Sequence, residues 1–502
     1  MIRIPNPPRV PSHSNRENQG YTLLPFRFLR LDDKRVLIVN DIGEFFPLCN
    51  ETFEQLISHT LDGGSPVFSD LKSRYFITEN VTAELLKIMA ERLRLKKSFL
   101  SGFTKLHIFV VTLRCDHSCQ YCQVSRQSAD RLQYDMSRET ADRSLELMFQ
   151  SPAHHLTMEF QGGEPLLNFE LIRYLIARAI KINQTQRRHI DFVIATNLSM
   201  ITDEMLRFCR DYNVQISTSL DGPRFVHNAN RPRPESNSYE VTIEGITRAR
   251  EVLGPGRVSA LMTTSRLSLD HPIEIIDEYV KQGFRTIFLR PISPYGFAAK
   301  TSRATGYEFE KFMEFYKTGL DYILDMNRRG FDFQETYAKI ILTKILTPFD
   351  THYVDLQSPS GLGISVLVYN YDGDVYASDE SRMLAEMRDH RFRLGNVHKN
   401  SYKEFFLSEA LRSTLPAFCV EALPGCSECA FQPFCGTDPV YHHTIQGDVF
   451  GHRPTSAFHK RNFGIIKLLF HYIFDDPEAR RIFLAWVMDN SVSRTKPERI
   501  SA

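Results

Sequence analysis

The chain has 502 residues, a formal net charge of +1 and a hydrophobic fraction of 42%. These values are ordinary for a soluble globular protein, and the near-zero charge gives no electrostatic reason to expect a nucleic acid or an acidic membrane as a partner. No stretch has the roughly 18 uninterrupted apolar residues of a membrane span, and the N-terminus lacks the apolar region of a secretory signal. The sequence therefore predicts a cytoplasmic protein of about three domains.

The N-terminal part is predicted to be a lead-in followed by a small α+β module. Residues 1–20 are rich in Pro, Asn and Ser, which is typical of disordered segments. Within residues 21–100, a strand, a turn and a second strand at 35–48 precede two amphipathic helical segments at 50–61 and 81–95. Short strands followed by two helices suit a winged-helix-like module, which is either a peptide-recognition unit or a structural cap.

Between residues 101 and 305, six apolar strand segments alternate with helical segments. The first strand, at 106–113, is continuously apolar, as expected for a strand that is buried on both faces. Strict alternation of strands and helices favours a parallel sheet with helical crossovers. Because six units fall short of the eight of a closed barrel, we predict an α/β fold, an open partial (β/α)6 barrel, with ligands at the carboxyl ends of its strands.

The remaining chain is predicted to contain three further segments. Residues 306–360 have helical spacing and form a helical connector. Residues 361–465 begin with a β-hairpin that turns at Asp372-Gly373 and continue into a cysteine-rich region. Residues 466–502 form a C-terminal helical tail.

Seven of the nine cysteines fall into two groups. The first group, with the spacing C-x3-C-x2-C directly after the first barrel strand, is Cys115, Cys119 and Cys122. The second group is Cys419, Cys426, Cys429 and Cys435. In a reducing compartment, clustered cysteines are metal ligands or catalysts more often than disulfides. The isolated Cys49 and Cys209 are interpreted as buried thiols.

Three thiolates in one short loop are one ligand short of a closed metal site. Zinc would need a fourth ligand, and His117 lies between two of the cysteines, where the loop does not readily fold it onto the same ion. A [4Fe–4S] cluster held by three thiolates instead leaves one iron open, which a small molecule can chelate through an amine and a carboxylate. A zinc loop is the alternative interpretation.

The cysteine loop and a second motif resemble those of the radical SAM superfamily. That motif is "EFQGGEP", Glu159–Pro165, at the end of the second strand. The resemblance implies that the open iron binds the methionine end of S-adenosylmethionine and that Tyr121 lies near the adenine. It also implies that Gly162, Gly163 and Glu164 hold the methionine amino group.

Two later strand ends extend this resemblance. Asn197 ends the third strand, and the fourth ends in "STSLDGP". By the same resemblance, Asn197 faces the cofactor, and Ser219 and Asp221 face the cofactor or its ribose. Arg231 is expected either to pair with the carboxylate of the cofactor or to be a solvated loop residue.

The resemblance also implies a chemistry. A reduced cluster donates one electron to the bound S-adenosylmethionine, and the resulting 5′-deoxyadenosyl radical takes a hydrogen atom from an unactivated carbon of the substrate. The cofactors carry the difficult step, while the protein aligns them and excludes water.

The second cysteine group has two interpretations, a zinc ribbon or an auxiliary iron–sulfur cluster. "CSECAFQPFC" resembles the centre of the SPASM or twitch extensions of radical SAM proteins. The chain departs from that pattern, because Ser378 and Pro439 stand where such proteins commonly have cysteines. We therefore predict one auxiliary cluster at most, with His459 interpreted as a surface histidine.

Phrases such as "LHIFVVTLRC", "FLRPISPYGFA" and "PGCSECAFQPFCGTDP" resemble HxsB, the radical SAM maturase family of the His-Xaa-Ser system, over residues 21–465. The resemblance implies a ribosomally made peptide or small protein with His-Xaa-Ser repeats as substrate, a second paired radical SAM protein and an external electron donor. The alternatives are an oxidase of a Cys or Ser side chain similar to the anaerobic sulfatase maturases, and a non-catalytic zinc-binding scaffold.

Overall fold

The computed structural model describes residues 20–127, 130–351 and 353–488. The predicted lead-in at 1–20, except for Gly20, and the end of the predicted tail, 489–502, lie outside the described residues. The chain divides into two compact units. The first holds the residues up to Arg94 together with Glu428–Pro433, and the second holds Leu95–Ser427 and the residues from Phe434 onward.

The first unit is a small antiparallel sheet packed against two helices. Its strands β2 (Phe26–Arg30), β3 (Arg35–Asn40) and β4 (Phe45–Cys49) form one sheet, and β1 (Thr22–Leu23) pairs with β5 (Ile77–Thr78). Helices α1 (Asn50–Ile57) and α2 (Pro66–Ser73) complete the unit. Its core includes Ile38, Leu56, Leu71 and Phe76, all fully buried. The strand–turn–strand prediction for 35–48 is confirmed, and the winged-helix comparison stays a prediction.

Two sequence-based expectations for this part of the chain differ from the structure. Helix α3 (Ala83–Lys96) forms close to the predicted range, but none of its residues is buried, so its apolar spacing does not mark a packed face. Cys49, expected to be buried, is exposed. Its sulfur instead accepts a hydrogen bond from the backbone N–H of Thr52 (3.5 Å) and caps α1.

The second unit is built on a mixed sheet of eight strands with the order β10-β9-β8-β7-β6-β13-β14-β15. Five consecutive parallel strands form most of it: β6 (Leu106–Thr112), β7 (His155–Gly162), β8 (His189–Thr196), β9 (Gln215–Ser219) and β10 (Val258–Leu261). These are five of the six predicted strands. Every residue of β6 except the first is buried, as its continuous apolar run predicts.

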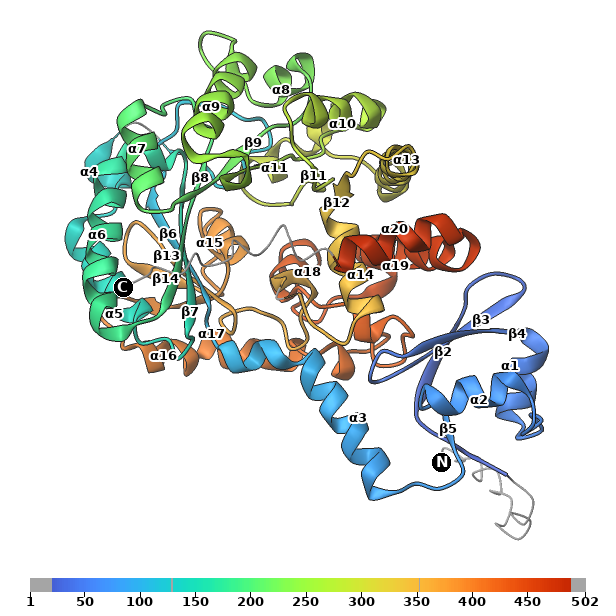
Figure 1. Ribbon diagram of the computed structural model, residues 1–502. Coiled ribbons are helices and arrows are strands. Elements are labelled where there is room, and N and C mark those ends of the chain that lie inside the picture. The colour runs from blue at the N-terminus through green and yellow to red at the C-terminus, as the bar shows by residue number, and fades with distance from the viewer. Residues whose placement is uncertain (1–19, 128–129, 352, 489–502) are drawn as a thin grey trace, which may run out of the picture. The chain divides into compact units, whose positions relative to one another are not determined.

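Helices connect these strands and cover the outer face of the sheet (Figure 1). They are α4 (Arg131–Tyr134), α5 (Arg138–Met148), α6 (Phe169–Gln186), α7 (Asp203–Asp211), α8 (Arg224–Asn230), α9 (Ser238–Leu253) and α10 (Pro272–Lys281). In α6 the buried residues Ile172, Leu175, Ile176 and Ala179 follow helical spacing, which gives the helix one apolar face toward the sheet. The predicted crossover architecture is confirmed, and the sheet is not closed into a barrel.

The sixth predicted strand and the predicted hairpin lie in different places from those expected. β11 (Thr286–Ile287) leaves the large sheet and pairs with β12 (Gln334–Glu335). The hairpin of β13 (Val366–Tyr369) and β14 (Asp374–Tyr376) forms with the predicted Asp372-Gly373 turn, and β13 lies parallel to β6. β15 (Arg393–Asn396) follows. The hairpin therefore covers the free edge of the first barrel strand, which would otherwise expose unpaired backbone groups.

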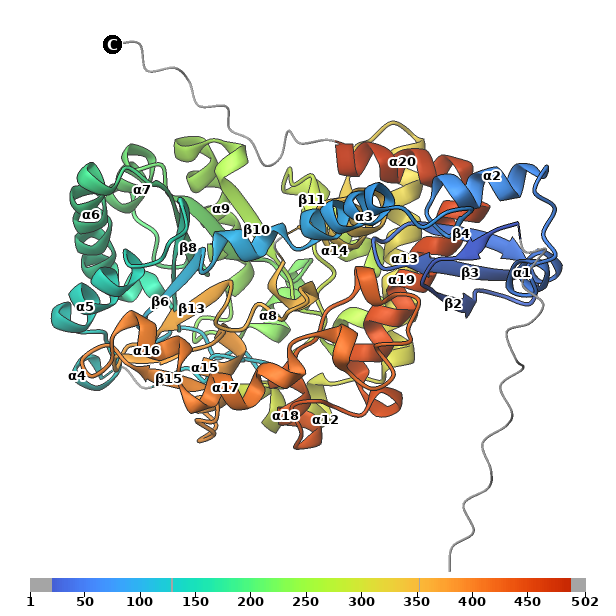
Figure 2. The same cartoon turned by 90° about the horizontal axis from the view of Figure 1, so that it is seen from below.

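The other helices of this unit pack beside the sheet. Helices α13 (Phe309–Arg328), α14 (Thr336–Leu346), α19 (Ala457–Asp475) and α20 (Pro477–Met488) contact one another, and α16 (Tyr402–Phe406) and α17 (Glu409–Thr414) contact β15 (Figure 2). The short helices are α11 (Gly296–Lys300), α12 (Ser302–Thr305), α15 (Asp379–Ala385) and α18 (Pro439–Gln446). In the described part of the chain, no helix combines the length and the apolar character needed to cross a membrane.

Shortening one buried side chain of the large sheet tests the packing of this core. Leu156 on β7 is fully buried, whereas Leu132 on α4 is 99% exposed. We expect Leu156→Ala to lower the free energy of unfolding, measured by urea denaturation, by about 2–5 kcal/mol, because it removes buried methyl groups and leaves a cavity. The matched control Leu132→Ala should stay within about 0.5 kcal/mol of the parent. Equal effects of the two substitutions would contradict the assignment of β7 to the core.

Candidate active site

The cysteine loop is anchored where it leaves β6. The guanidinium of Arg114 donates two hydrogen bonds of 2.8 Å to the carboxylate of Asp135 and one of 2.9 Å to the carbonyl of Leu167. Arg114 is 7% exposed. A bidentate pair of this kind combines strength with a fixed orientation, so the chain direction is set just before Cys115.

Backbone hydrogen bonds hold the rest of the loop. The N–H of Ser118 donates to the carbonyl of Pro232 (2.7 Å), and that of Gln120 donates to the carbonyl of Asn230 (3.2 Å). On the other side, Cys122 accepts at its carbonyl from the N–H of Phe297 (2.7 Å). The loop is therefore positioned by segments that follow the fourth and sixth predicted strands.

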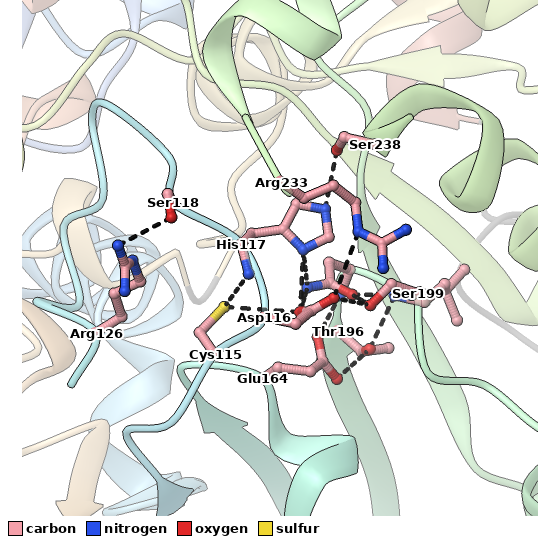
Figure 3. A network of polar contacts seen from close by, with 12 residues as sticks. Cys115, Asp116, His117, Ser118, Arg126, Glu164, Thr196, Ser199, Arg233 and Ser238 are labelled. Carbon is pink, nitrogen blue, oxygen red and sulfur yellow. Dashed lines mark hydrogen bonds and ion pairs between the residues drawn. The ribbon is translucent and has the colours of Figure 1, made fainter. Parts of the chain in front are cut away.

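His117 is held inside the loop by protein partners (Figure 3). Its Nδ1 lies 3.0 Å from Oδ1 of Asp116 and 2.9 Å from Nδ2 of Asn197, and its Nε2 lies 2.9 Å from Oγ of Ser238. The side chain is 2% exposed. Both ring nitrogens are thus occupied, which agrees with the expectation that His117 is not a metal ligand.

The three cysteines of the loop line one cavity of about 240 Å3. The carboxyl ends of four parallel strands line the same cavity, through Gln161–Gly163, Ala195–Asn197, Ser217–Ser219 and Leu261–Thr263. The predicted ligand edge of the sheet therefore coincides with the cysteine loop. Tyr121 and Arg231 also line this cavity.

Burial favours the protonated form of two thiols of this loop, those of Cys115 and Cys119. Burial, followed by the charge of Cys119, raises the pKa of Cys115. Burial also raises the pKa of Cys119 to about 12, with a further contribution from Cys122. These mutual effects show that the three sulfurs are neighbours. A bound metal group would reverse this preference, because metal coordination deprotonates thiols.

The donor geometry of the loop favours a cluster over a single ion. The ligands of one zinc ion lie 2.0–2.3 Å from it and so converge to within about 4.8 Å. Among the residues that the structure describes, only His155, His189 and Asp191 place three such atoms within 4.8 Å of one another. The cysteine sulfurs and His117 do not converge in this way, whereas a larger multi-iron group needs more widely spaced thiolates.

The glycine pair at the end of β7 lets two backbones meet closely. A Cβ on Gly162 would lie 2.2 Å from the carbonyl oxygen of Thr112, and one on Gly163 would lie 2.3 Å from that of Arg114. The N–H of Gly163 donates to Thr112 (2.8 Å), and that of Glu164 donates to Arg114 (2.7 Å). The glycines are therefore required where β7 meets the start of the cysteine loop, and they also line the cavity.

Glu164 lies beneath this contact and is fully buried. Its carboxylate accepts hydrogen bonds from the hydroxyl of Thr196 (2.6 Å) and from the backbone N–H groups of Asn197 (2.8 Å) and Leu166 (3.0 Å). Burial raises the pKa of Glu164 to about 7, and these hydrogen bonds oppose the shift. Glu164 thus joins the ends of β7 and β8, and its predicted contact with the cofactor remains a prediction.

Asp221 and Arg231 form a buried ion pair behind Tyr121. The guanidinium donates to both carboxylate oxygens (3.1 and 3.2 Å), and its charge lies 5.4 Å from the centre of the Tyr121 ring. The hydroxyl of Tyr121 also donates to Asp221. Asp221 is fully buried, so the alternative of Arg231 as a solvated loop residue is wrong. A role of either residue toward a cofactor remains a prediction.

The cavity retains polar groups that the protein does not satisfy. Thr218 is 2% exposed and lines the cavity, and within the described chain its hydroxyl has no hydrogen-bond partner. Ser219 lies next to it on the same wall. Asn197, in contrast, is engaged, because its amide group binds Asp116 and His117 and accepts from Ser199. Unsatisfied buried hydroxyls are uncommon in native proteins and indicate a missing partner, so these residues fit a polar ligand.

Sequence reasoning assigned no role to several residues that line this cavity: Glu159, Gln161, Arg290 and Met383. It offered Asp379 and Glu380 only as guesses for a general base, and Asp379 lines this cavity. Burial raises the pKa of Glu159, with Asp379 adding to the shift and Arg290 opposing it, so these three groups face one another. The alternation of side chains along β7 was an available signal for Glu159 and Gln161. No local signal marks Arg290 or Met383.

Three members of the second cysteine group belong to the second unit. Cys426 and Cys435 lie near each other, since burial and then the charge of Cys426 raise the pKa of Cys435. Cys419 also has a raised pKa because of burial. Cys429 lies in Glu428–Pro433, which belongs to the first unit, so the complete ligand set remains a prediction. The cysteine-rich segment is consistent with an auxiliary iron–sulfur cluster.

Comparison with curated proteins yields several relatives of low identity. The chain is 23% identical over 310 residues to the cysteine-type anaerobic sulfatase-maturating enzyme of Clostridium perfringens, covering 58% of this chain and 77% of that protein. It is 22% identical over 241 residues to the radical SAM cyclopropyl synthase TigE of Paramaledivibacter caminithermalis, covering 45% and 47%. The chain thus spans about half the length of several curated relatives.

Solved structures share the fold. Native anSMEcpe with bound AdoMet superposes with a TM-score of 0.60 at 17% identity, covering 76% of this chain and 99% of that one. SuiB of Streptococcus suis bound to its precursor peptide SuiA gives a TM-score of 0.50 at 14% identity, covering 87% and 99%.

The Radical SAM superfamily matches residues 109–279, from β6 through α10. Proteins of this superfamily use a [4Fe–4S] cluster and S-adenosylmethionine. The matched segment holds the three-cysteine loop, the glycine pair and the strand ends that line the cavity. Residues 109–279 therefore form a radical SAM domain.

Proposed function

We propose that this protein cleaves S-adenosylmethionine reductively and uses the radical to modify a ribosomally made peptide or protein. The observation that carries the proposal is the cavity in which Cys115, Cys119 and Cys122 meet the carboxyl ends of four parallel strands. When bound, the cluster and S-adenosylmethionine supply a 5′-deoxyadenosyl radical that takes a hydrogen atom from the substrate. A sulfatase-maturating relative and a protein of the same fold that was solved with its precursor peptide support a peptide or protein substrate.

The residues of the chain would bind and orient these groups. The three thiolates would hold the cluster, since they share one cavity wall. The glycine pair exposes backbone at the neighbouring wall, while Thr218 and Ser219 offer hydroxyls to a polar ligand. The Asp221–Arg231 pair fixes the ring of Tyr121 in the cavity wall. Buried surroundings exclude water from a reactive radical.

A more specific proposal concerns the substrate and the partners. By the resemblance described above, the substrate is a peptide with His-Xaa-Ser repeats, and a second radical SAM protein and an external electron donor act with this one. We further propose that Cys419, Cys426, Cys429 and Cys435 hold an auxiliary cluster, that the N-terminal unit recognises the peptide, and that the protein works in the cytoplasm. An oxidase of a Cys or Ser side chain is the second candidate, favoured by the match to the sulfatase-maturating enzyme.

Anaerobic co-expression with candidate peptides, followed by mass measurement of each peptide, tests the proposal. A defined mass change that requires this protein is the expected result. A loss of two hydrogens indicates a cross-link or an oxidation, and peptide mapping separates the two candidates. Unchanged peptides, together with no formation of 5′-deoxyadenosine by the reconstituted protein, would reject the proposed activity.

Substitution of one loop cysteine tests the cluster assignment. Cys119→Ala should abolish formation of 5′-deoxyadenosine, because a cluster with two thiolates is not held. If two [4Fe–4S] clusters form in the parent, the iron content should fall from about eight to about four atoms per chain. The control Cys49→Ala, at an exposed cysteine outside both groups, should keep both values. Tightly bound zinc without iron in the parent would instead support the scaffold alternative.

The contact at the end of β7 gives a second test. In Gly163→Ala the new methyl group would lie 2.3 Å from a backbone carbonyl, so the cysteine loop has to shift. A displacement of about 1 Å in an active site costs on the order of 100-fold in rate, and we expect a loss of that size in 5′-deoxyadenosine formation. Gly102→Ala is the control, because its methyl group meets no atom within 4 Å. A parent-like rate in Gly163→Ala would contradict this view of the site.

A further inference from the structure

A second, smaller cavity adjoins the cysteine-lined one. It has a volume of about 40 Å3 and is lined by three carboxylates, those of Asp355, Glu380 and Asp438. Arg290 lines both cavities. Since Asp379 lines the cysteine-lined cavity and Glu380 the smaller one, the two cavities also meet at the start of α15. We call the smaller cavity the acidic pocket.

The carboxylates of the acidic pocket are only partly satisfied. Asp355 accepts a hydrogen bond from the hydroxyl of Tyr353 (3.1 Å), and Asp438 accepts one from the backbone N–H of Tyr441 (2.9 Å). Among the described residues, no other residue donates a hydrogen bond to the Glu380 carboxylate and none forms an ion pair with it. Carboxylates that share a poorly solvated site repel one another unless a cation lies between them.

A buried hydroxyl without a partner faces the same pocket. Tyr295 is 1% exposed and lines the pocket, and its hydroxyl has no hydrogen-bond partner within the described chain. Burial, followed by the charges of Asp438, Glu380 and Asp355, raises the pKa of this phenol, so its hydroxyl lies beside the three acids. A group that donates several hydrogen bonds at this point would satisfy the tyrosine oxygen and the acids together.

The arginines of the pocket do not complete it. The positive charge of Arg461 interacts with the carboxylates of Asp355 and Asp438. Its guanidinium packs over the rings of Tyr337 (5.9 Å) and Phe458 (5.1 Å). Arg290 faces Glu159 in the cysteine-lined cavity. Burial, followed by the charges of the neighbouring acids, raises the pKa of Glu380 to about 8 and that of Asp438 to about 7. These raised pKa values agree with an excess of negative charge in the acidic pocket.

The pocket suits an organic cation better than a metal ion. In the part of the chain that the structure describes, the three acids do not bring their oxygens within 4.8 Å of one another, as a shared ion would require. A water molecule needs roughly 10–15 Å3 of such volume, so 40 Å3 holds about three waters or one ammonium or guanidinium group. A larger cavity of about 360 Å3 continues beyond Arg461 and Tyr441 and could receive the rest of a peptide.

We propose that the acidic pocket binds the positively charged end of a substrate side chain, an ammonium or guanidinium group, and so selects a basic residue beside the cysteine-lined cavity. This inference rests on the proposed action on a peptide. The three carboxylates and Tyr295 supply acceptors from α15, the N-cap of α18 and the segments around 295 and 355. A neutral side chain of equal length would leave these acceptors unpaired, which is how polar sites discriminate strongly.

Equilibrium binding to the full-length, cluster-loaded protein tests the pocket without requiring turnover. The probes are fluorescein-labelled pentapeptides Ala-Ala-Xaa-Ala-Ala in which Xaa is lysine, arginine or norleucine, measured by fluorescence anisotropy. We expect the lysine or the arginine peptide to bind about tenfold more tightly than the norleucine peptide, as for a hydrogen-bonded charge. The preferred cation identifies the head group.

Variants separate this pocket from general charge attraction. In Glu380→Gln/Asp438→Asn the preference for the cationic peptide should disappear, and each single substitution and Tyr295→Phe should reduce it. The control Glu409→Gln, at an exposed acid that starts α17, should keep it. Neutral variants relieve the mutual repulsion of the acids, and their folding is checked by cluster absorbance and circular dichroism.

Two outcomes would overturn the proposal: equal or absent binding of all three peptides to the parent, or a preference that persists in Glu380→Gln/Asp438→Asn. Formation of 5′-deoxyadenosine by the parent, measured in the same preparations without peptide, reports on the proposed function separately. A parent that cleaves S-adenosylmethionine but ignores the charge of Xaa would reject the pocket alone. A parent that prefers the cation but produces no 5′-deoxyadenosine would reject the radical chemistry alone.

Discussion

The close approach of the β7 end to the start of the cysteine loop is the constraint on which the site depends. Gly162 and Gly163 let the backbone of β7 reach the carbonyls of Thr112 and Arg114, and a side chain at either position would separate them. This contact places Glu164 where it binds Thr196 and Asn197 at the end of β8. Three neighbouring strand ends are thereby fixed by the protein alone, before any cofactor binds.

Two carboxylates near the site are each paired with an arginine. Asp221 has Arg231, and Asp135 has Arg114. The buried hydroxyls of Thr218 and Tyr295 have no hydrogen-bond partner among the described residues. Because unpaired buried polar groups destabilise a fold, their concentration in two adjoining cavities, both lined by Arg290, marks the surface that ligands complete.

Local patterns predicted most of the fold and the centre of the site. The alternation of strands and helices gave five of the parallel strands, and Asp372-Gly373 forms the turn of its hairpin. Two strand pairings were not predicted. β11 pairs with β12 outside the large sheet, and β13 pairs with β6 although the two strands are more than 250 residues apart in the sequence. Such pairings depend on which edge remains uncovered after the other strands have packed, and no local pattern records that.

The sequence by itself predicted the three-cysteine loop and its glycine pair, because the C-x3-C-x2-C spacing and the adjacent glycines are short-range features that do not depend on the rest of the fold. Tertiary structure decided everything that requires distant segments to meet. It paired Arg231 with Asp221, and it gathered Tyr295, Asp355, Glu380 and Asp438 around one pocket. These residues come from separate loops and helix ends, whose meeting depends on the packing of the whole second unit, so their arrangement has no signature in the sequence.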